Sequence, residues 1–179
     1  MGSVRNRDVA AVDAFLAESK ALKSEIPEWK KSSRRGDVEC IWHIIDSAGT
    51  ERAHLRFRCP IDNRAFPTVL LIFRNYQICR VDCVPDDECK YNPPWAYSVG
   101  APPTVCGNHE HAWQDNRVYL LGIGQQEPPW TTPCRRPLPA AIRRIPQILP
   151  WFTEKIGLSM PSCWREFDLP PQTELFAMR

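Results

Sequence analysis

Residues 51–59 carry the clearest periodic signal in the chain and constrain its fold most strongly. Apolar and basic side chains alternate there, the apolar set being Ala53, Leu55, Phe57 and Cys59 and the basic set being Arg52, His54, Arg56 and Arg58. Because successive side chains of a β-strand point to opposite faces, this pattern predicts a strand with one face in the core and one basic face. A solvated sheet surface is the simpler interpretation of that basic set. The functional hypothesis is a surface that binds phosphate groups or RNA.

The neighbouring segments predict further strands of the same sheet. Residues 37–46 alternate, residues 67–74 form a nearly continuous apolar run, and residues 76–83 follow after a tight turn at Asn75. Residues 117–123 have the composition of one more strand. Since short turns join consecutive segments, we expect an antiparallel meander of five or six strands within residues 37–123.

Two segments have the spacing of helices. Residues 8–24 repeat apolar side chains every three or four positions, and so do residues 139–157, where Pro146 and Pro150 predict a kink or two shorter helices. Residues 158–179 are expected to form a tail that packs through Trp164, Phe167 and Leu169. Together these patterns predict one α+β domain over residues 1–179, with an N-terminal and a C-terminal helix around an antiparallel sheet.

Proline and cysteine usage adds two expectations. The chain of 179 residues has 18 prolines, and the proline-rich stretch 85–105 is expected to be a loop of functional importance. The first residues have no apolar segment typical of a secretory signal, and four of the eight cysteines (Cys40, Cys59, Cys79, Cys83) lie within apolar runs. We therefore expect reduced, buried cysteines and a cytoplasmic protein without a membrane span. The net charge of +2 is too small to indicate a partner by itself.

Two pairs of polar residues point to a candidate site. His109 and His111 are separated by one residue, as are Arg80 and Asp82, so each pair lies on one face if its segment is extended. We expect the strand 76–83 to lie beside 108–113 and to bring the four side chains together. The histidines would act as acid and base, Asp82 would orient an imidazole, and Arg80 would contact a phosphate. This combination is typical of a metal-independent ribonuclease, with no cofactor.

Other interpretations of the same residues stay open. Cys106, His109 and His111, together with Asp82, have a spacing that permits a zinc site. Alternatively, the His-x-His segment is structural, with its imidazoles bonded to a carboxylate or a loop carbonyl. The chain would then be a non-catalytic protein-binding module, such as an inhibitor or an antitoxin-like partner.

The segments Tyr76-Gln-Ile-Cys-Arg80-Val-Asp82, Asn92-Pro93 and His109-Glu-His111 resemble a loose group of small bacterial and phage proteins. One branch of the group is the TumE-type toxins of toxin–antitoxin systems. The resemblance covers roughly residues 67–113 and implies a mobile-element or host–phage conflict setting, with RNA or a cognate protein as partner. The order of helix, meander, proline-rich loop and helix is also similar to ubiquitin-conjugating-like domains, whose cysteine nucleophile would be Cys106 or Cys89.

Overall fold

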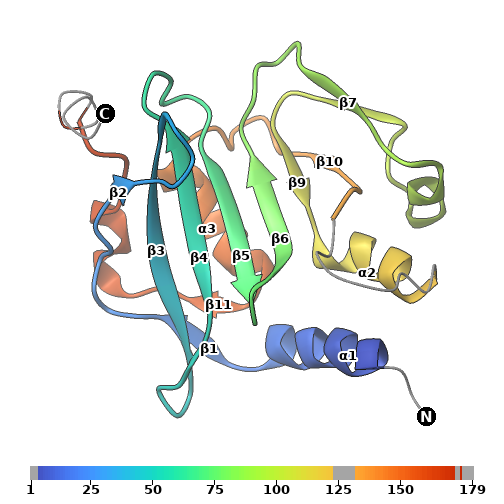
Figure 1. Cartoon of the computed structure of the whole chain (residues 1–179), viewed down its shortest axis with the longest axis horizontal. Helices are drawn as coiled ribbons and strands as arrows, with labels where there is room; N and C mark the ends of the chain where they lie inside the picture. The colour runs from blue at the N-terminus through green and yellow to red at the C-terminus, as the bar shows by residue number, and fades with distance from the viewer. Residues whose placement is uncertain (1–3, 123–131, 172–173, 175–179) are drawn as a thin grey trace.

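The computed structural model describes residues 4–122, 132–171 and 174. It has the predicted α+β fold, in which one large sheet carries a helix across one of its faces (Figure 1). The helices are α1 (Val4–Ala17), α2 (Trp113–Gly122) and α3 (Ile145–Lys155), with short 3-10 helices η1 (Pro94–Val99) and η2 (Ser162–Glu166). None of the helices in the described ranges combines the length and the apolar character that crossing a membrane requires.

The large sheet has nine strands in the described part of the chain, more than the five or six expected. Eight of them lie in the order β10 (Arg136–Pro137), β9 (His109–His111), β6 (Tyr76–Asp82), β5 (Thr68–Phe73), β4 (Glu51–Pro60), β3 (Asp37–Asp46), β1 (Lys20–Leu22) and β11 (Leu158–Ser159). The ninth, β2 (Lys30–Lys31), also pairs with β3. The predicted meander is β3 to β6, which is antiparallel throughout, whereas β1 and β11 pair in parallel.

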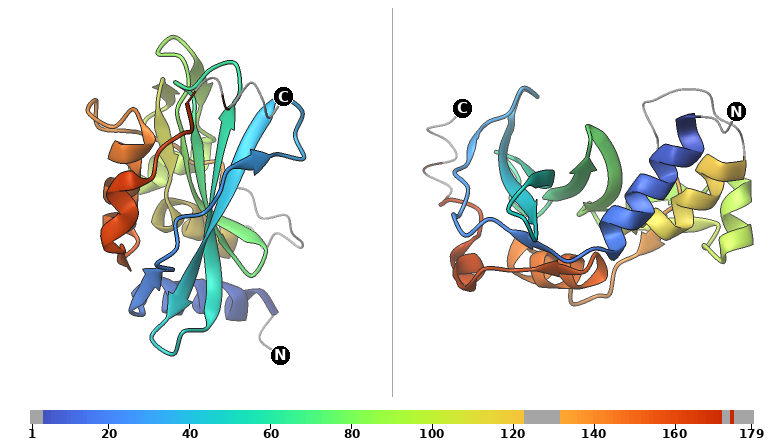
Figure 2. Two further views of the ribbon diagram at one scale, coloured as in Figure 1. Left: turned by 90° about the vertical axis from the view of Figure 1, so that its left-hand side faces the viewer. Right: turned by 90° about the horizontal axis from the view of Figure 1, so that it is seen from below.

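The two faces of this sheet are different. The alternation in β4 is confirmed, because Ala53, Leu55, Phe57 and Cys59 are buried while the residues between them are only partly covered. Helix α3 packs on the apolar face through Ile148, Leu149 and Phe152. Figure 2 shows α3 and the C-terminal segment on that side of the sheet, whereas no described helix lies across the opposite side, called here the open face. Helices α1 and α2 lie together beside the β9 end of the sheet.

The predicted helix over residues 8–24 is wrong at its C-terminal end. Helix α1 ends at Ala17, and Lys20–Leu22 form strand β1 between β3 and β11. Leu22 is buried, and it packs as part of a strand. Hydrogen bonds to two neighbouring strands thus outweigh the helical propensity of lysine, alanine and leucine.

The predicted strand over residues 117–123 is also wrong, because Trp113–Gly122 form α2 and residue 123 lies outside the described residues. Tyr119 stacks on Trp95 with ring centroids 4.7 Å apart, and Arg117 forms an ion pair with Asp13 of α1. A short apolar run does not distinguish a strand from a helix by its periodicity alone. These tertiary contacts decide the conformation.

The stretch 85–105, expected to be a loop, contains regular structure. Strands β7 (Cys89–Tyr91) and β8 (Thr104–Cys106) pair with each other, enclose η1, and are joined by a disulfide between Cys89 and Cys106. Asn92 organises the stretch, because its buried side chain bonds to Pro102 and to both backbone groups of Arg135. The four cysteines of the apolar runs are buried free thiols, as expected.

The C-terminal helix is shorter than the predicted 139–157 and is a single helix, Ile145–Lys155. Pro146 lies in the first turn, where the backbone N–H has no partner within the helix, so its absence costs no hydrogen bond. Pro150 lies inside the helix, which continues past it to Lys155. Gly157 follows the C-cap residue with a φ of +62°, the left-handed conformation that glycine commonly adopts after the end of a helix. The predicted tail packs as expected, since Phe167 and Leu169 are buried and Trp164 contacts the core.

We expect Phe167→Ala to lower the free energy of unfolding by about 3–5 kcal/mol, the usual cost of removing a buried phenyl ring. Phe167 is 2% exposed, and its ring centroid lies 4.8 Å from that of Phe57 and 4.9 Å from that of Trp42. Urea unfolding followed by fluorescence measures the change. Tyr97→Ala is the control, because Tyr97 is 52% exposed. Equal stability of the two variants would show that the tail does not contribute to the core.

Candidate functional site

Strand pairing places the four predicted site residues on one face of the sheet. Strands β6 and β9 are neighbours, with Arg80 opposite His111 and Asp82 opposite His109. Directly opposed residues of an antiparallel pair project to the same side, here the open face. Val81 and Glu110, between them, point to the other face, where Glu110 pairs with Lys155 of α3. The convergence expected from the sequence is therefore observed.

Asp82 is the centre of this cluster. The Nε atom of Arg80 lies 2.7 Å from the Asp82 carboxylate, and the Thr68 hydroxyl donates to Oδ1 at 3.0 Å. The Nε2 atoms of His109 and His111 lie 3.5 and 3.4 Å from Oδ2. Thr68 is a member of the site that sequence analysis missed. The signal that could have found it is a hydroxyl within an otherwise apolar strand.

Backbone carbonyls fix the other side of both imidazoles. Nδ1 of His109 lies 2.8 Å from the carbonyl oxygen of Gly107, and Nδ1 of His111 bonds to the carbonyl of Thr132. Gly107 is at the turn between β8 and β9 with a φ of +70°, and a Cβ there would lie 3.3 Å from the side chain of Asp86. Glycine at this position thus allows the turn that brings the carbonyl to His109.

The cluster is almost entirely buried, except at Arg80. Asp82, His109 and His111 are 2–4% exposed, whereas 40% of the Arg80 side chain is exposed. Burial alone would raise the pKa of Asp82, but the adjacent His111 imidazole and the charge and hydrogen bond of Arg80 outweigh burial and lower the pKa to about 2. Burial lowers the pKa of His109, and the bond to Gly107 and the charge of Asp82 only partly oppose this effect. Asp82 is therefore a stable anion.

The basic set of β4 lies on the same open face as the cluster. Across the sheet, Arg58 pairs with Thr68 and Thr68 with Asp82, while Arg56 pairs with Leu70 and Leu70 with Arg80. Two cross-strand rows therefore connect β4 with the cluster through β5. The sequence separately predicted the basic face and the site, but only the register of three strands shows that they form one surface.

The members of the basic set have different surroundings. Arg52 pairs with Asp46 at the exposed end of β4, at 3.7 Å, and Arg58 lies 3.5 Å from Glu39. The Nε atoms of Arg56 and Arg58 and the Nε2 atom of His54 are covered without a hydrogen-bond partner. Burial lowers the pKa of His54 to about 4, with the charges of Arg56 and His43 acting in the same direction. At neutral pH the positive charge of this set therefore comes from its arginines.

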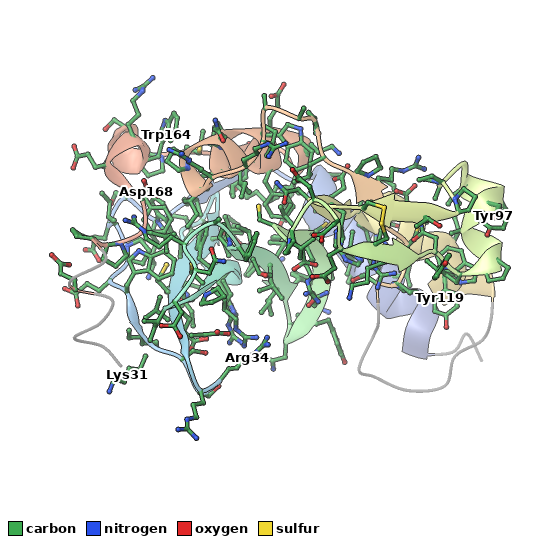
Figure 3. The ribbon with its side chains drawn as sticks, turned by 90° about the horizontal axis from the view of Figure 1, so that it is seen from above. Lys31, Arg34, Tyr97, Tyr119, Trp164 and Asp168 are labelled. Carbon is green, nitrogen blue, oxygen red and sulfur yellow. A yellow bond between two sulfur atoms is a disulfide. The ribbon has the colours of Figure 1, made fainter. Side chains whose placement is uncertain are left out.

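A hollow of about 200 Å³ lies between the basic set and the cluster. Its lining includes Arg34, Arg58, Thr68 and Arg80. Arg34 comes from the segment between β2 and β3 and was not predicted as a site residue, because its sequence context is that of a solvated basic linker. In Figure 3, Arg34 and Trp164 lie on opposite sides of the sheet, which places Arg34 on the open face.

The two cysteines next to the site are joined to each other. In the disulfide, neither Cys106 nor Cys89 is a free thiol, so neither can act as the nucleophile of a ubiquitin-conjugating-like enzyme. Cys106 is also excluded as the zinc ligand that the sequence permitted. The donor set that the structure brings together is Asp82, His109 and His111, whose candidate ligand atoms lie within 4.8 Å of one another.

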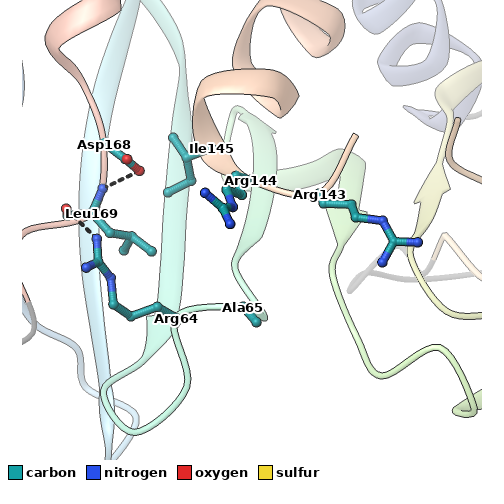
Figure 4. Close-up of a pocket in the computed structure, with 7 residues that line it drawn as sticks. All are labelled: Arg64, Ala65, Arg143, Arg144, Ile145, Asp168 and Leu169. Carbon is teal, nitrogen blue, oxygen red and sulfur yellow. Dashed lines mark hydrogen bonds between the residues drawn. The ribbon is translucent and has the colours of Figure 1, made fainter. Parts of the chain in front are cut away.

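A larger pocket of about 470 Å³ is separate from this site (Figure 4). It lies at the start of α3 and is lined by Arg64, Arg143 and Arg144. The Arg64 guanidinium donates to the carbonyl of Leu169 at 2.9 Å, and the Arg143 side chain points away from the other two. The three guanidinium groups therefore do not converge on one ligand position.

We expect the stability of the protein to fall between pH 6.5 and pH 4, and His54→Gln to reduce this fall. The pKa of His54 is about 4 in the folded chain and near 6.5 when exposed, so the unfolded chain binds more protons within this window. Urea unfolding at several pH values measures the slope, and NMR titration measures the pKa. Arg165→Gln, a substitution in η2, is the control. An unchanged slope in His54→Gln would contradict the assignment.

The chain was compared with protein-family models, with curated proteins and with solved structures. None of the three comparisons found a match. The resemblance to TumE-type toxins therefore stays a prediction, and the function has to be inferred from the site itself.

Proposed function

We propose that the protein binds RNA along the open face of the sheet and cleaves the strand at the cluster around Asp82. The observation that carries this proposal is the continuity of the basic set and the cluster across β4, β5 and β6. A polyanion lying over Arg56 and Arg58 would meet the Arg80 side chain, the exposed member of the cluster. RNA-directed function thus follows from one surface that combines phosphate contacts with groups able to transfer protons.

The unsatisfied donors on this face support an anionic partner. Among the described residues, the covered Nε atom of Arg56 has no hydrogen-bond acceptor, and that of Arg58 has only the Glu39 carboxylate nearby, at 3.5 Å. The Arg58 side chain is 29% exposed and lines the hollow, so its guanidinium group can form a charge-assisted hydrogen bond with a phosphate oxygen. The hollow beside Arg80 gives a phosphate a place between Arg58 and the cluster.

Cleavage of RNA requires few groups, because the strand carries its own nucleophile. The 2′-hydroxyl must lose its proton to attack the neighbouring phosphorus, and the leaving 5′ oxygen must gain one. Arg80 would stabilise the charge on the phosphate. The metal-independent version, in which His109 and His111 carry out both transfers, stays a prediction, as do a mobile-element setting, a cognate protein partner and a cytoplasmic location.

A second candidate function is a non-catalytic protein-binding module. The observation that favours it is the burial of both imidazoles, which are 2% and 4% exposed. Their bonds to the carbonyls of Gly107 and Thr132 also hold β9 and the segment before β10 in place. In this case the cluster is structural, and substitutions in it lower stability without removing any reaction.

We expect Arg56→Gln to weaken RNA binding about equally for all sequences and to reduce the salt dependence of the affinity by about one phosphate contact. Fluorescence anisotropy with a labelled single-stranded RNA at several salt concentrations measures both quantities. Arg165→Gln is the matched control, because Arg165 lies in η2, in the layer of α3. An equal effect of the two substitutions would show that the open face is not the RNA surface.

We expect Arg80→Gln to lower the rate of RNA cleavage about 100-fold or more, the usual effect of removing a group that stabilises transition-state charge. Arg80 is partly exposed, so the variant is expected to fold, and circular dichroism checks this point. Cleavage of a radiolabelled RNA is followed at saturating protein. Full activity in Arg80→Gln would contradict the role of Arg80, and no activity in the unmodified protein would favour the non-catalytic function.

A further inference from the structure

We propose that Asp82, His109 and His111 bind one divalent transition-metal ion of the zinc class. The inference goes beyond the RNA-directed function, since it is based on the geometry of three side chains and is tested without RNA. Two imidazoles and one carboxylate are a ligand set that zinc and neighbouring first-row metals prefer. Mg²⁺ and Ca²⁺ prefer all-oxygen sites, so they fit this set poorly.

The backbone decides which imidazole nitrogens are available to a metal. A carbonyl oxygen only accepts hydrogen bonds, so the Nδ1 atoms that face Gly107 and Thr132 must carry the protons. In the neutral tautomer fixed in this way, Nε2 has a free lone pair. Both Nε2 atoms face Oδ2 of Asp82, so three lone-pair donors converge on one point.

The distances fit a metal better than direct hydrogen bonds. The separations of 3.5 and 3.4 Å between Nε2 and Oδ2 are long for a hydrogen bond between an imidazole and a carboxylate. Two ligand atoms bound to one zinc ion at about 2.0–2.1 Å with tetrahedral angles lie roughly 3.4 Å apart. These two separations therefore have the length that a shared metal ion requires.

The surrounding groups hold the ligands as a metal site requires. Metal-binding histidines usually donate their other ring N–H to a carbonyl or carboxylate, and both imidazoles do so here. Thr68 donates to Oδ1 of Asp82, the oxygen that does not face the imidazoles. Arg80 bonds to the same carboxylate and competes for its charge, so the site would hold its metal less tightly than a site without that cation.

A bound metal would change the role of the histidines. Its bonds would use the lone pairs that acid–base catalysis needs, so the metal replaces the metal-independent mechanism expected from the sequence. Three protein ligands leave a coordination position for water or for a phosphate oxygen. The chain's own contribution would be to orient the three ligands and to direct the phosphate with Arg80.

The test is metal content and affinity in the full chain, prepared without a histidine tag. After dialysis against micromolar zinc, atomic emission is expected to give one zinc ion per chain, and a fluorescent chelator competition gives the affinity. His111→Gln is expected to lose stoichiometric zinc. Thr68→Val keeps all three ligands but loses the hydroxyl that orients Asp82, and we expect an affinity 10–100-fold lower.

His43→Gln is the control for adventitious binding, because His43 is an exposed histidine elsewhere on the open face. It is expected to keep one zinc ion per chain. The proposal is overturned if the unmodified protein holds no zinc, or if Thr68→Val and His111→Gln bind zinc as the unmodified protein does. Should His111→Gln fail to fold, the unmodified protein and Thr68→Val still decide the question.

The outcome is separable from that of the RNA-directed function. Zinc binding without any RNA cleavage would support the metal site and contradict the ribonuclease. Cleavage by protein that holds no zinc would support the ribonuclease, in its metal-independent form, and overturn the metal site.

Discussion

The buried charge of Asp82 is the constraint on which the candidate site depends. A carboxylate that is 4% exposed would cost several kcal/mol if it had no partners. The structure compensates this charge with Arg80 on the same strand and with the Thr68 hydroxyl on β5. The pairing of β9 with β6 then places both histidines against this carboxylate.

The two faces of the sheet have different roles in the structure. One face forms the core with α3, and the other stays open and collects the basic set, the hollow and the cluster. On β6 and β9, the residue between the two site residues points to the opposite face. Glu110 of β9 does so and forms an ion pair with Lys155 of α3. A shift of one residue in the register of β9 would exchange the histidines for Glu110.

The conformation of several segments could not be predicted from local pattern. Lys20–Leu22 is a strand because β3 and β11 supply hydrogen bonds on both sides, and Trp113–Gly122 is a helix because it packs against α1 and η1. The stretch 85–105 has its structure because Asn92 and the Cys89–Cys106 disulfide join parts that are distant in sequence. In each case the deciding contacts are long-range, which periodicity does not record.

The sequence by itself determined the strands β3 to β6 and the burial of their apolar faces. It also determined that Arg80 shares a face with Asp82, and His109 with His111. These features follow from the two-residue period of a strand, which is a local property. The tertiary structure decided that the two pairs and the basic set of β4 meet on one surface, and that Thr68, Gly107 and Thr132 hold the site. These features depend on strand order and register, which arise only when distant segments pair.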